Sequence, residues 1–291
     1  MLSILIPTYN TSVYELVKRL HNEATLLGID FEICVGDDAS TQYRDENNQV
    51  TALKNCSLCR AEQNSGRTYQ RQLLANKANY NLLLFLDADV MPTTANFLAN
   101  YLNKQPTLNE VVFGGYHYRA SHERNQSLRH RFGRQREYAT VENRIQKPYK
   151  YIFSGNLFIQ KQTYLQLAIP TANQYGMDIL FADALQQQNI KPIHINNTVD
   201  HLGLETNEAF LNKALQAVAL RYTYRHSINT PFENNFQRLK KYKADRLFSK
   251  GMQWLSPIFR KNLFSKKPSM LMFDLYRLGY YCTLHQEESK H

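Results

Sequence analysis

Hydrophobic and polar positions alternate along the first part of the chain in blocks that are typical of an α/β domain. Short apolar runs at Ser3–Pro7, Phe31–Val35 and Leu82–Leu86 have the length and continuity of buried strands. Between the first two runs, apolar residues recur near the helical period from Leu16 to Leu27. The pattern predicts strands that alternate with helices, and hence an α/β fold with a mixed, mostly parallel central sheet.

Polar loops follow each of these three strands. The loops contain Pro7, Thr8, Tyr9 and Asn10, then Asp37 and Asp38, then Asp87 and Asp89. In open α/β sheets, ligands bind outside the carboxyl ends of the strands, where the loops carry the chemistry. We therefore expect the three loops to meet in one site.

The acid pair after the third strand is a candidate metal site. Asp87 and Asp89 are one residue apart, and hard cations such as Mn²⁺ and Mg²⁺ take carboxylate oxygens that they share with substrate phosphates. The alternative is that the pair caps a following helix, with Pro92 near its first turn.

Two arginines lie on the helix predicted after Asn64-Ser65-Gly66. Arg67 and Arg71 are four residues apart, which places them on one face of a helix, where they could bind a diphosphate together. A solvated helix face explains the same spacing.

The order and spacing of these motifs resemble those of family 2 glycosyltransferases, which have the A-type nucleotide-sugar fold. The motifs are Ile-Pro-Thr-Tyr-Asn near the start, Asp37-Asp38-Ala39-Ser40, Asn64-x-Gly66 with Arg71, and Asp87-Ala88-Asp89. The resemblance covers roughly residues 1–225. It implies a single Rossmann-like catalytic domain, which we place at residues 1–230.

The resemblance also implies a role for each candidate residue. The nucleotide-sugar donor would be held by Pro7, Thr8, Tyr9, Asn10, Asp37, Asp38, Arg67, Arg71 and Asp87. Asp38 would accept the imide N–H of a uracil or thymine base. A divalent cation, Mn²⁺ or Mg²⁺, would be bound by Asp87, Asp89 and His201, although a lone histidine is more often structural.

On the acceptor side, the resemblance points to Asn156 and Asp178. Asn156 could exchange hydrogen bonds with sugar hydroxyls, although an asparagine after a glycine also forms turns. Family members usually show a Glu-Asp pair at the start of a helix, with the aspartate as general base. Here Met177 precedes Asp178. We give Asp178 the role of the base; a simple acid at a helix N-terminus is the alternative.

The charge of the chain indicates a polyanionic partner. The formal net charge is +10, which fits nucleic acid, an anionic membrane or a phosphate-bearing substrate. Basic residues are dense in the segments 119–150 and 238–268. A nucleic-acid-binding protein would explain them, but no recognised module accompanies them, and a mobile loop over an anionic donor explains the first segment equally. We expect no nucleic acid partner.

Residues 231–291 are predicted to form a basic, amphipathic helical region. Apolar residues and Trp254 lie among its Lys and Arg residues, as in helices that lie on anionic membranes. Packing on the catalytic domain is the alternative. No run reaches the length of a membrane span, and the first residues lack the pattern of a secretory signal. We expect a cytoplasmic protein with peripheral contact to the inner face of the cytoplasmic membrane.

The expected function is transfer of a sugar, with inversion, from a nucleoside-diphosphate donor. A UDP-sugar is the expected donor, and a saccharide or lipid-linked saccharide in surface polysaccharide synthesis is the expected acceptor. Two alternatives remain open at this point, namely a catalytically impaired relative that only binds nucleotide-sugar, and a nucleic-acid-binding protein.

Overall fold

The chain divides into two compact units. The computed structural model describes residues 1–120, 123–170, 173–228 and 230–288. The first, here called the sheet unit, comprises Met1–Arg119, Glu137–Asn173 and Asp178–Gly203. The second, here called the helical unit, comprises Ala120–Arg136, Gln174–Met177 and Leu204–His291. The predicted functional division at residue 230 stays a prediction.

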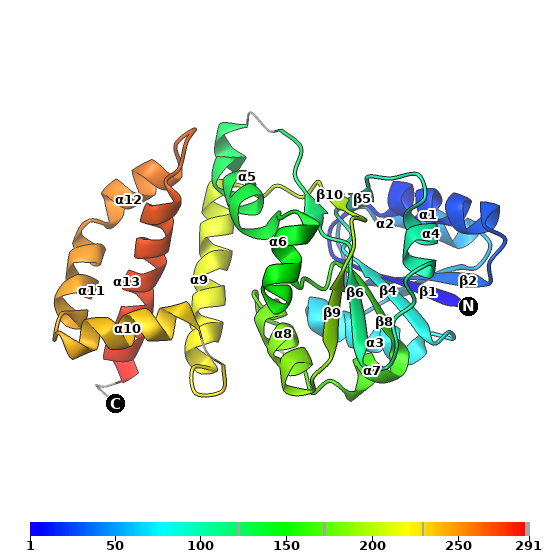
Figure 1. Ribbon diagram of the computed structural model, residues 1–291. Helices are drawn as coiled ribbons and strands as arrows, with labels where there is room; N and C mark the ends of the chain where they lie inside the picture. Colours follow the sequence, from blue (N-terminus) through cyan, green and yellow to red (C-terminus); the bar gives the residue numbers. More distant parts are fainter. Residues whose placement is uncertain (121–122, 171–172, 229, 289–291) are drawn as a thin grey trace. The chain divides into compact units, whose positions relative to one another are not determined.

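A seven-stranded sheet forms the centre of the sheet unit (Figure 1). In spatial order its strands are β3 (Cys56–Arg60), β2 (Phe31–Asp37), β1 (Leu2–Thr8), β4 (Leu82–Leu86), β8 (Asn156–Gln160), β6 (Glu110–Phe113) and β9 (Lys191–His194). Strand β8 is antiparallel to its neighbours β4 and β6, and the other pairs are parallel. This confirms the predicted α/β fold class with a mixed, mostly parallel sheet.

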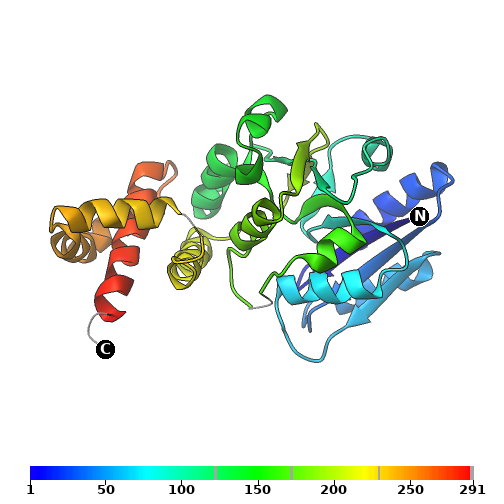
Figure 2. The same ribbon diagram turned by 60° about the horizontal axis from the view of Figure 1, so that its bottom comes forward.

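Helices cover both faces of this sheet. Helices α1 (Tyr14–Leu26) and α4 (Phe97–Leu102) lie on one face, and α3 (Arg67–Lys77) and α7 (Lys161–Gln166) lie on the other, which is turned toward the viewer in Figure 2. The unit also contains α2 (Arg44–Asn48), α6 (Val141–Gln146) and α8 (Asp178–Gln187). Because both faces are covered, all seven residues of β1 are buried.

A second, three-stranded sheet forms where two extended segments of the chain are interrupted. The run Val111–Tyr116 breaks into β6 and β7 (Tyr116–His117) at Gly114 and Gly115, and Gly115 has a φ of 92°. The segment from Lys191 to His201 likewise divides into β9 and β10 (Val199–His201). Strand β10 then pairs with β7 and with β5 (Val90–Pro92). Glycine is required at position 114 because a side chain at Gly114 would collide with the Asn197 carbonyl.

Two local features differ from what residue types suggest. Serine often caps helices, but Ser12 does not cap α1: the cap residue is Val13, and the Ser12 hydroxyl donates to the Glu46 carboxylate. The basic segment 119–150 is not a single mobile loop, because its described residues include α5 (Ser127–Phe132), a π-helical turn at Gly133–Glu137, and α6. Residues 121–122 of that segment lie outside the described residues.

The helical unit is built around the helix α13 (Met270–Glu288). This helix packs against α9 (Asn207–Thr223), α10 (Pro231–Lys241), α11 (Asp245–Trp254) and α12 (Ser256–Leu263). Pro257 lies in the first turn of α12 and so interrupts the basic region. Within the described part of the chain, no helix combines the length and the apolar character that crossing a bilayer requires.

Candidate functional site

The site lies at the carboxyl edge of the central sheet, where the strand order changes direction. Strands β2 and β4 pair with opposite edges of β1, so chain connections leave β1 and β4 in different directions. Open α/β sheets form their binding crevice at such a point. The loops after β1, β2 and β4 are the three that carry the predicted residues.

Asp38 organises the loop that begins α3. Its carboxylate accepts hydrogen bonds from the backbone N–H groups of Ser65 and Gly66, both at 2.8 Å, and from Gln70 Nε2 at 2.9 Å. Gly66 has a φ of 91°, and a side chain there would meet Asn173, so the close approach requires glycine. Asp38 thereby ties the end of β2 to the start of α3, and its direct contact with a nucleobase stays a prediction.

Asp37 lies beneath the site rather than in it. Its side chain is fully buried, and it accepts hydrogen bonds from the Ser40 N–H and from Arg60 Nε, both at 2.8 Å. Burial opposes ionisation, but the bonds from Ser40 and Arg60 hold the pKa of Asp37 below its usual range. The predicted donor contact of Asp37 is therefore corrected to a supporting role in the loop after β2.

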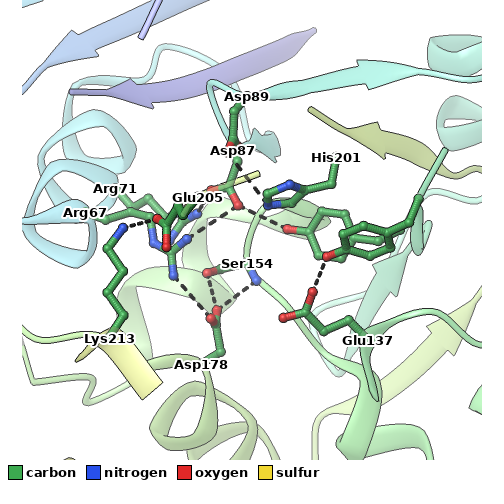
Figure 3. Close-up of polar contacts among 12 residues, drawn as sticks. Arg67, Arg71, Asp87, Asp89, Glu137, Ser154, Asp178, His201, Glu205 and Lys213 are labelled. Carbon is green, nitrogen blue, oxygen red and sulfur yellow. Dashed lines mark hydrogen bonds and ion pairs between the residues drawn. The ribbon is translucent and has the colours of Figure 1, made fainter. Parts of the chain in front are cut away.

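The buried Asp87 carboxylate is contacted by the donor groups of three side chains. Arg71 of α3 forms an ion pair with Oδ1, and Oδ2 is contacted by Arg67 Nη1 at 3.5 Å and by the Tyr116 hydroxyl at 3.1 Å (Figure 3). Arg67 and Arg71 thus share a helix face, as their spacing predicted. Both oxygens of Asp87 are engaged, so this carboxylate positions the two arginines, and its predicted metal role stays a prediction.

The charges around Asp87 determine its ionisation. Burial would raise the pKa of Asp87, but the positive charges of Arg67 and Arg71 outweigh it, and the pKa lies below its usual range. Burial, with the nearby Asp87 charge, raises the pKa of Tyr116 well above its ordinary value. Tyr116 therefore stays protonated and donates its hydrogen bond across the physiological range.

Asp178 is held by Ser154 and lies beside Arg67. Oδ1 accepts from the Ser154 hydroxyl at 2.6 Å and from its N–H at 3.1 Å, and Oδ2 lies 3.3 Å from Arg67 Nη2 (Figure 3). Asp178 is the first residue of α8, as predicted. Arg67 therefore joins the carboxylates of Asp87 and Asp178, which are 91 positions apart in the sequence.

Asp89 and His201 are brought together by the small sheet. His201 pairs with Val90 across β10 and β5, and His201 Nε2 lies 3.7 Å from Asp89 Oδ2. The imidazole lies between two tyrosine rings, with centroid distances of 5.7 Å to Tyr116 and 5.5 Å to Tyr118. Tyr118 in turn donates to Glu137 (Figure 3). The pairing and the rings fix the imidazole next to the carboxylate.

The Asp89–His201 pair fits a Mn²⁺ or Mg²⁺ ion that is shared with a substrate. The Asp89 side chain is 32% exposed, so its oxygens can reach a ligand. Cations of this kind are commonly bound by one or two protein ligands, with substrate phosphates and water completing the shell. Among the described residues, no group of three His, Cys, Asp or Glu side chains could hold a metal ion.

The first predicted loop exposes one side chain. Pro7 and Thr8 are buried at the end of β1, and Asn10 Oδ1 accepts from the N–H groups of Thr41 and Gln42. Tyr9 is 51% exposed. Of these four, Tyr9 has the most exposed side chain, and the donor contacts of all four stay predictions.

Asn156 does not face an acceptor. It is fully buried, and its amide bonds to the Tyr101 hydroxyl at 2.6 Å, the Gly115 carbonyl at 2.8 Å and the Asn197 carbonyl at 3.0 Å. Its predicted acceptor role is corrected: Asn156 stabilises the backbone at the break between β6 and β7.

Sequence reasoning missed several residues that complete the site. Two of them are close in the sequence to predicted site residues: Ser154 lies two residues before Asn156, and Gln70 lies beside Arg71. Tyr116 and Tyr118 carried no signal, because their role depends on β7 pairing with β10, far along the chain.

Comparisons with known proteins agree with this geometry. The family model described as "Glycosyl transferase family 2" matches residues 3–167. No curated protein matches the chain. The mannosyltransferase PcManGT from Pyrobaculum calidifontis, in complex with GDP-Man and Mn²⁺, is 14% identical, with 100% of this chain and 88% of that chain covered and a TM-score of 0.55.

A second similar structure is glucosyl-3-phosphoglycerate synthase from Mycobacterium tuberculosis, in complex with Mn²⁺, UDP-glucose and phosphoglyceric acid. It is 14% identical, with 79% of this chain and 81% of that chain covered and a TM-score of 0.54. At such identities the likeness shows the fold, which is the A-type glycosyltransferase fold. The family match spans more than half of the residues, and the chain therefore belongs to glycosyl transferase family 2.

Proposed function

We propose that this protein is an inverting, metal-dependent hexosyltransferase that uses a UDP-sugar and modifies a hydroxyl of a saccharide or lipid-linked saccharide in surface polysaccharide synthesis. One observation carries the proposal. Arg67 contacts both Asp87, at the end of the strand where the donor is expected, and Asp178, the candidate base. The donor and acceptor parts of the predicted site therefore lie side by side.

On the donor side, the protein supplies positive charge to the diphosphate. The Arg67 side chain is 41% exposed and can turn toward a ligand, whereas Arg71 is 3% exposed and keeps Asp87 ionised in place. Asp89 and His201 would hold the divalent cation, which stabilises the negative charge of a leaving diphosphate when it is bound. The UDP-glucose and GDP-Man named for the similar structures support a nucleoside-diphosphate donor.

On the acceptor side, Asp178 acts as the general base. Ser154 fixes Oδ1 through two hydrogen bonds, so Oδ2 is the oxygen that takes the proton of the acceptor hydroxyl. The acceptor oxygen then bonds to the anomeric carbon as the bond from that carbon to the diphosphate oxygen breaks. A single displacement inverts the configuration of the anomeric carbon.

Contact with an anionic membrane surface is part of the proposal. On α11 and α12, Leu247, Trp254 and Ile258 are 77%, 82% and 60% exposed. Leu247 and Trp254 are seven residues apart on α11 and so lie on one side of that helix. Ile258 is exposed on α12, and Arg246, Lys250 and Lys261 are exposed in the same segment. Exposed apolar residues with an indole and a basic surround are typical of helices that lie in the membrane interface.

The experiment that tests the function is a screen of nucleotide sugars with Mn²⁺, in which release of nucleoside diphosphate is measured with and without lipid-linked saccharides. We expect release with a UDP-sugar, and NMR of the product to show an inverted anomeric carbon. Donor binding without release by the unmodified protein would favour the impaired relative. Tighter binding of an oligonucleotide than of UDP with Mn²⁺ would favour the nucleic-acid-binding alternative.

A further inference from the structure

A basic cavity lies within the helical unit. It has a volume of about 590 Å³ and is lined mainly by residues of two segments, 123–135 and 266–268. Ligand sites typically fall in the range of about 300–1,000 Å³. The cavity therefore has the size of a small-ligand site, and none of the residues assigned to the donor or acceptor belongs to it.

The two walls of the cavity are held in place by bonds within the unit. The Ser127 hydroxyl donates to the Ser265 carbonyl at 2.6 Å, which joins the start of α5 to the turn after α12. Asn207 of α9 accepts from the Leu128 N–H at 2.8 Å and donates to the Arg124 carbonyl at 2.8 Å. Leu128 and Leu263 also belong to one buried cluster. The cavity is thus part of the packed unit and does not depend on a loose loop.

The lining carries a large excess of positive charge. Five cationic side chains contribute, with a single carboxylate, that of Glu123; the cations are Arg124, Arg131, Arg134, Lys266 and Lys267. None of the five takes part in an ion pair with a described carboxylate. Like charges at this density repel one another. A bound anion would relieve this repulsion.

We propose that this cavity binds a phosphate-rich anion, a diphosphate or an oligophosphate group. Three arginines offer planar forks that bind phosphate oxygens in pairs, and two lysines add compact charges. The net excess of four positive charges matches an anion with several negative charges. Such a group is carried by soluble oligophosphates and by phosphorylated lipid headgroups. This inference goes beyond the proposed function, because it concerns the helical unit alone.

The test is titration calorimetry of the full-length protein with inorganic tripolyphosphate, in EDTA so that no cation-dependent diphosphate binding contributes. We compare K266A/K267A and R134A with K240A/K241A. The control lysines are also adjacent and exposed, and they lie at the end of α10, away from the cavity lining. We expect each cavity variant to bind about tenfold more weakly, and the control to bind like the unmodified protein.

Binding that is equal in all variants, or absent in the unmodified protein, would overturn the proposal. Loss in the lysine variant without loss in R134A would also overturn it, because the two walls would then not form one site. Monomeric dihexanoyl phosphatidic acid distinguishes the sources. Competition between this lipid and tripolyphosphate for the cavity assigns a lipid headgroup, and binding of tripolyphosphate alone assigns a soluble ligand.

Discussion

Oδ1 of Asp178 accepts two hydrogen bonds from a single residue, Ser154, whose hydroxyl and N–H lie 2.6 and 3.1 Å away. One carboxylate oxygen is thereby fixed, and the orientation of the other is fixed with it. If Asp178 is the base, as we propose, it does not need to reorient when an acceptor binds, which is the arrangement that general base catalysis favours.

Replacing Asp178 by Asn should abolish transfer and spare donor binding. The amide keeps the shape of the side chain but cannot take the acceptor proton, so we expect kcat to fall by about a hundredfold or more. Steady-state release of nucleoside diphosphate with acceptor present measures the rate, and calorimetric titration with donor measures binding. Asp183→Asn, on the same helix, is the control. A D178N protein with unchanged kcat would remove Asp178 from the mechanism.

Asp89→Asn should weaken the response to Mn²⁺. The change removes the charged oxygen that lies next to His201 Nε2, so we expect a higher Mn²⁺ concentration for half-maximal activity and a kcat/KM lower by about tenfold or more. Activity titrated with Mn²⁺ provides the measurement. Asp30→Asn, an exposed position in the same unit, serves for comparison. Identical titrations for D89N and D30N would exclude Asp89 as a ligand.

Arg71→Ala should destabilise the fold far more than Arg67→Ala. Arg71 is buried with Asp87, so its removal leaves a buried carboxylate without its closest cation, at a cost of about 3 kcal/mol in the free energy of unfolding. Arg67 is partly exposed, and its removal should cost about 1 kcal/mol or less. Urea unfolding at pH 7 compares the two. The double variant R71A/D87N should regain part of the loss.

The Arg71–Asp87 ion pair should also make the free energy of unfolding depend on pH, with stability lost on acidification. The pKa of Asp87 is lowered in the folded state, so its contribution is present above the unfolded pKa, about 3.9, and is lost as the pH falls through the folded value. The difference between the unmodified protein and R71A should therefore shrink below about pH 4. An unfolding difference that grew on acidification would contradict the assignment.

His194 should make the fold sensitive to mild acid. Burial is the main cause that lowers the pKa of His194 to about 4, and its Nε2 lies 2.9 Å from the Pro148 carbonyl. The unfolded chain binds the proton from about pH 6.5 downward, so stability should decline between about pH 6.5 and pH 4, by roughly 2 kcal/mol. Thermal unfolding from pH 7.5 to 4.5 tests this. Glutamine does not titrate, so the His194→Gln variant should lose less stability as the pH falls. If its stability falls as steeply as that of the unmodified protein, other groups cause the loss.

Leu247→Ser should reduce binding to anionic vesicles, and the effect should increase with Trp254→Ser. Both side chains are exposed on α11, and each buried apolar group contributes to insertion. Sedimentation with vesicles of phosphatidylglycerol and phosphatidylcholine measures the bound fraction. Leu26→Ser on α1, where the leucine is 88% exposed, is the matched control. Equal sedimentation of L247S/W254S and L26S would exclude this face.

Much of the fold could be predicted from the sequence, because local patterns of apolar and polar residues indicate the strands and helices. The run Leu82–Leu86 became β4 with the predicted bounds, and the spacing of Arg67 and Arg71 placed both on one face of α3. What the pattern could not predict was the partner of each side chain. The neighbours of Asp87 in the sequence are acidic or apolar, whereas its neighbours in space are Arg71 and Tyr116.

Breaks in strands were the other feature that local patterns missed. The apolar run Val111–Tyr116 continues through Gly114 in the sequence, but the close approach of the Asn197 carbonyl divides it. Such an approach depends on a segment more than 80 residues later. Asn156 was misread for the same reason, since its three partners come from distant parts of the chain.

The short pairing of β10 with β5 places one residue of β10 next to Asp89. The number of residues that precede β10 decides which residue that is. Side chains alternate along β10, so that Asp200 points to His117 and Arg119 while His201 points to Asp89. Inserting one residue in the link 195–198 would shift the strand by one position, so that Asp200 takes the place of His201. An acid would then take the place of the imidazole, and two carboxylates would face each other. The site therefore requires a fixed length of this four-residue connection, just as it requires particular side chains on β10.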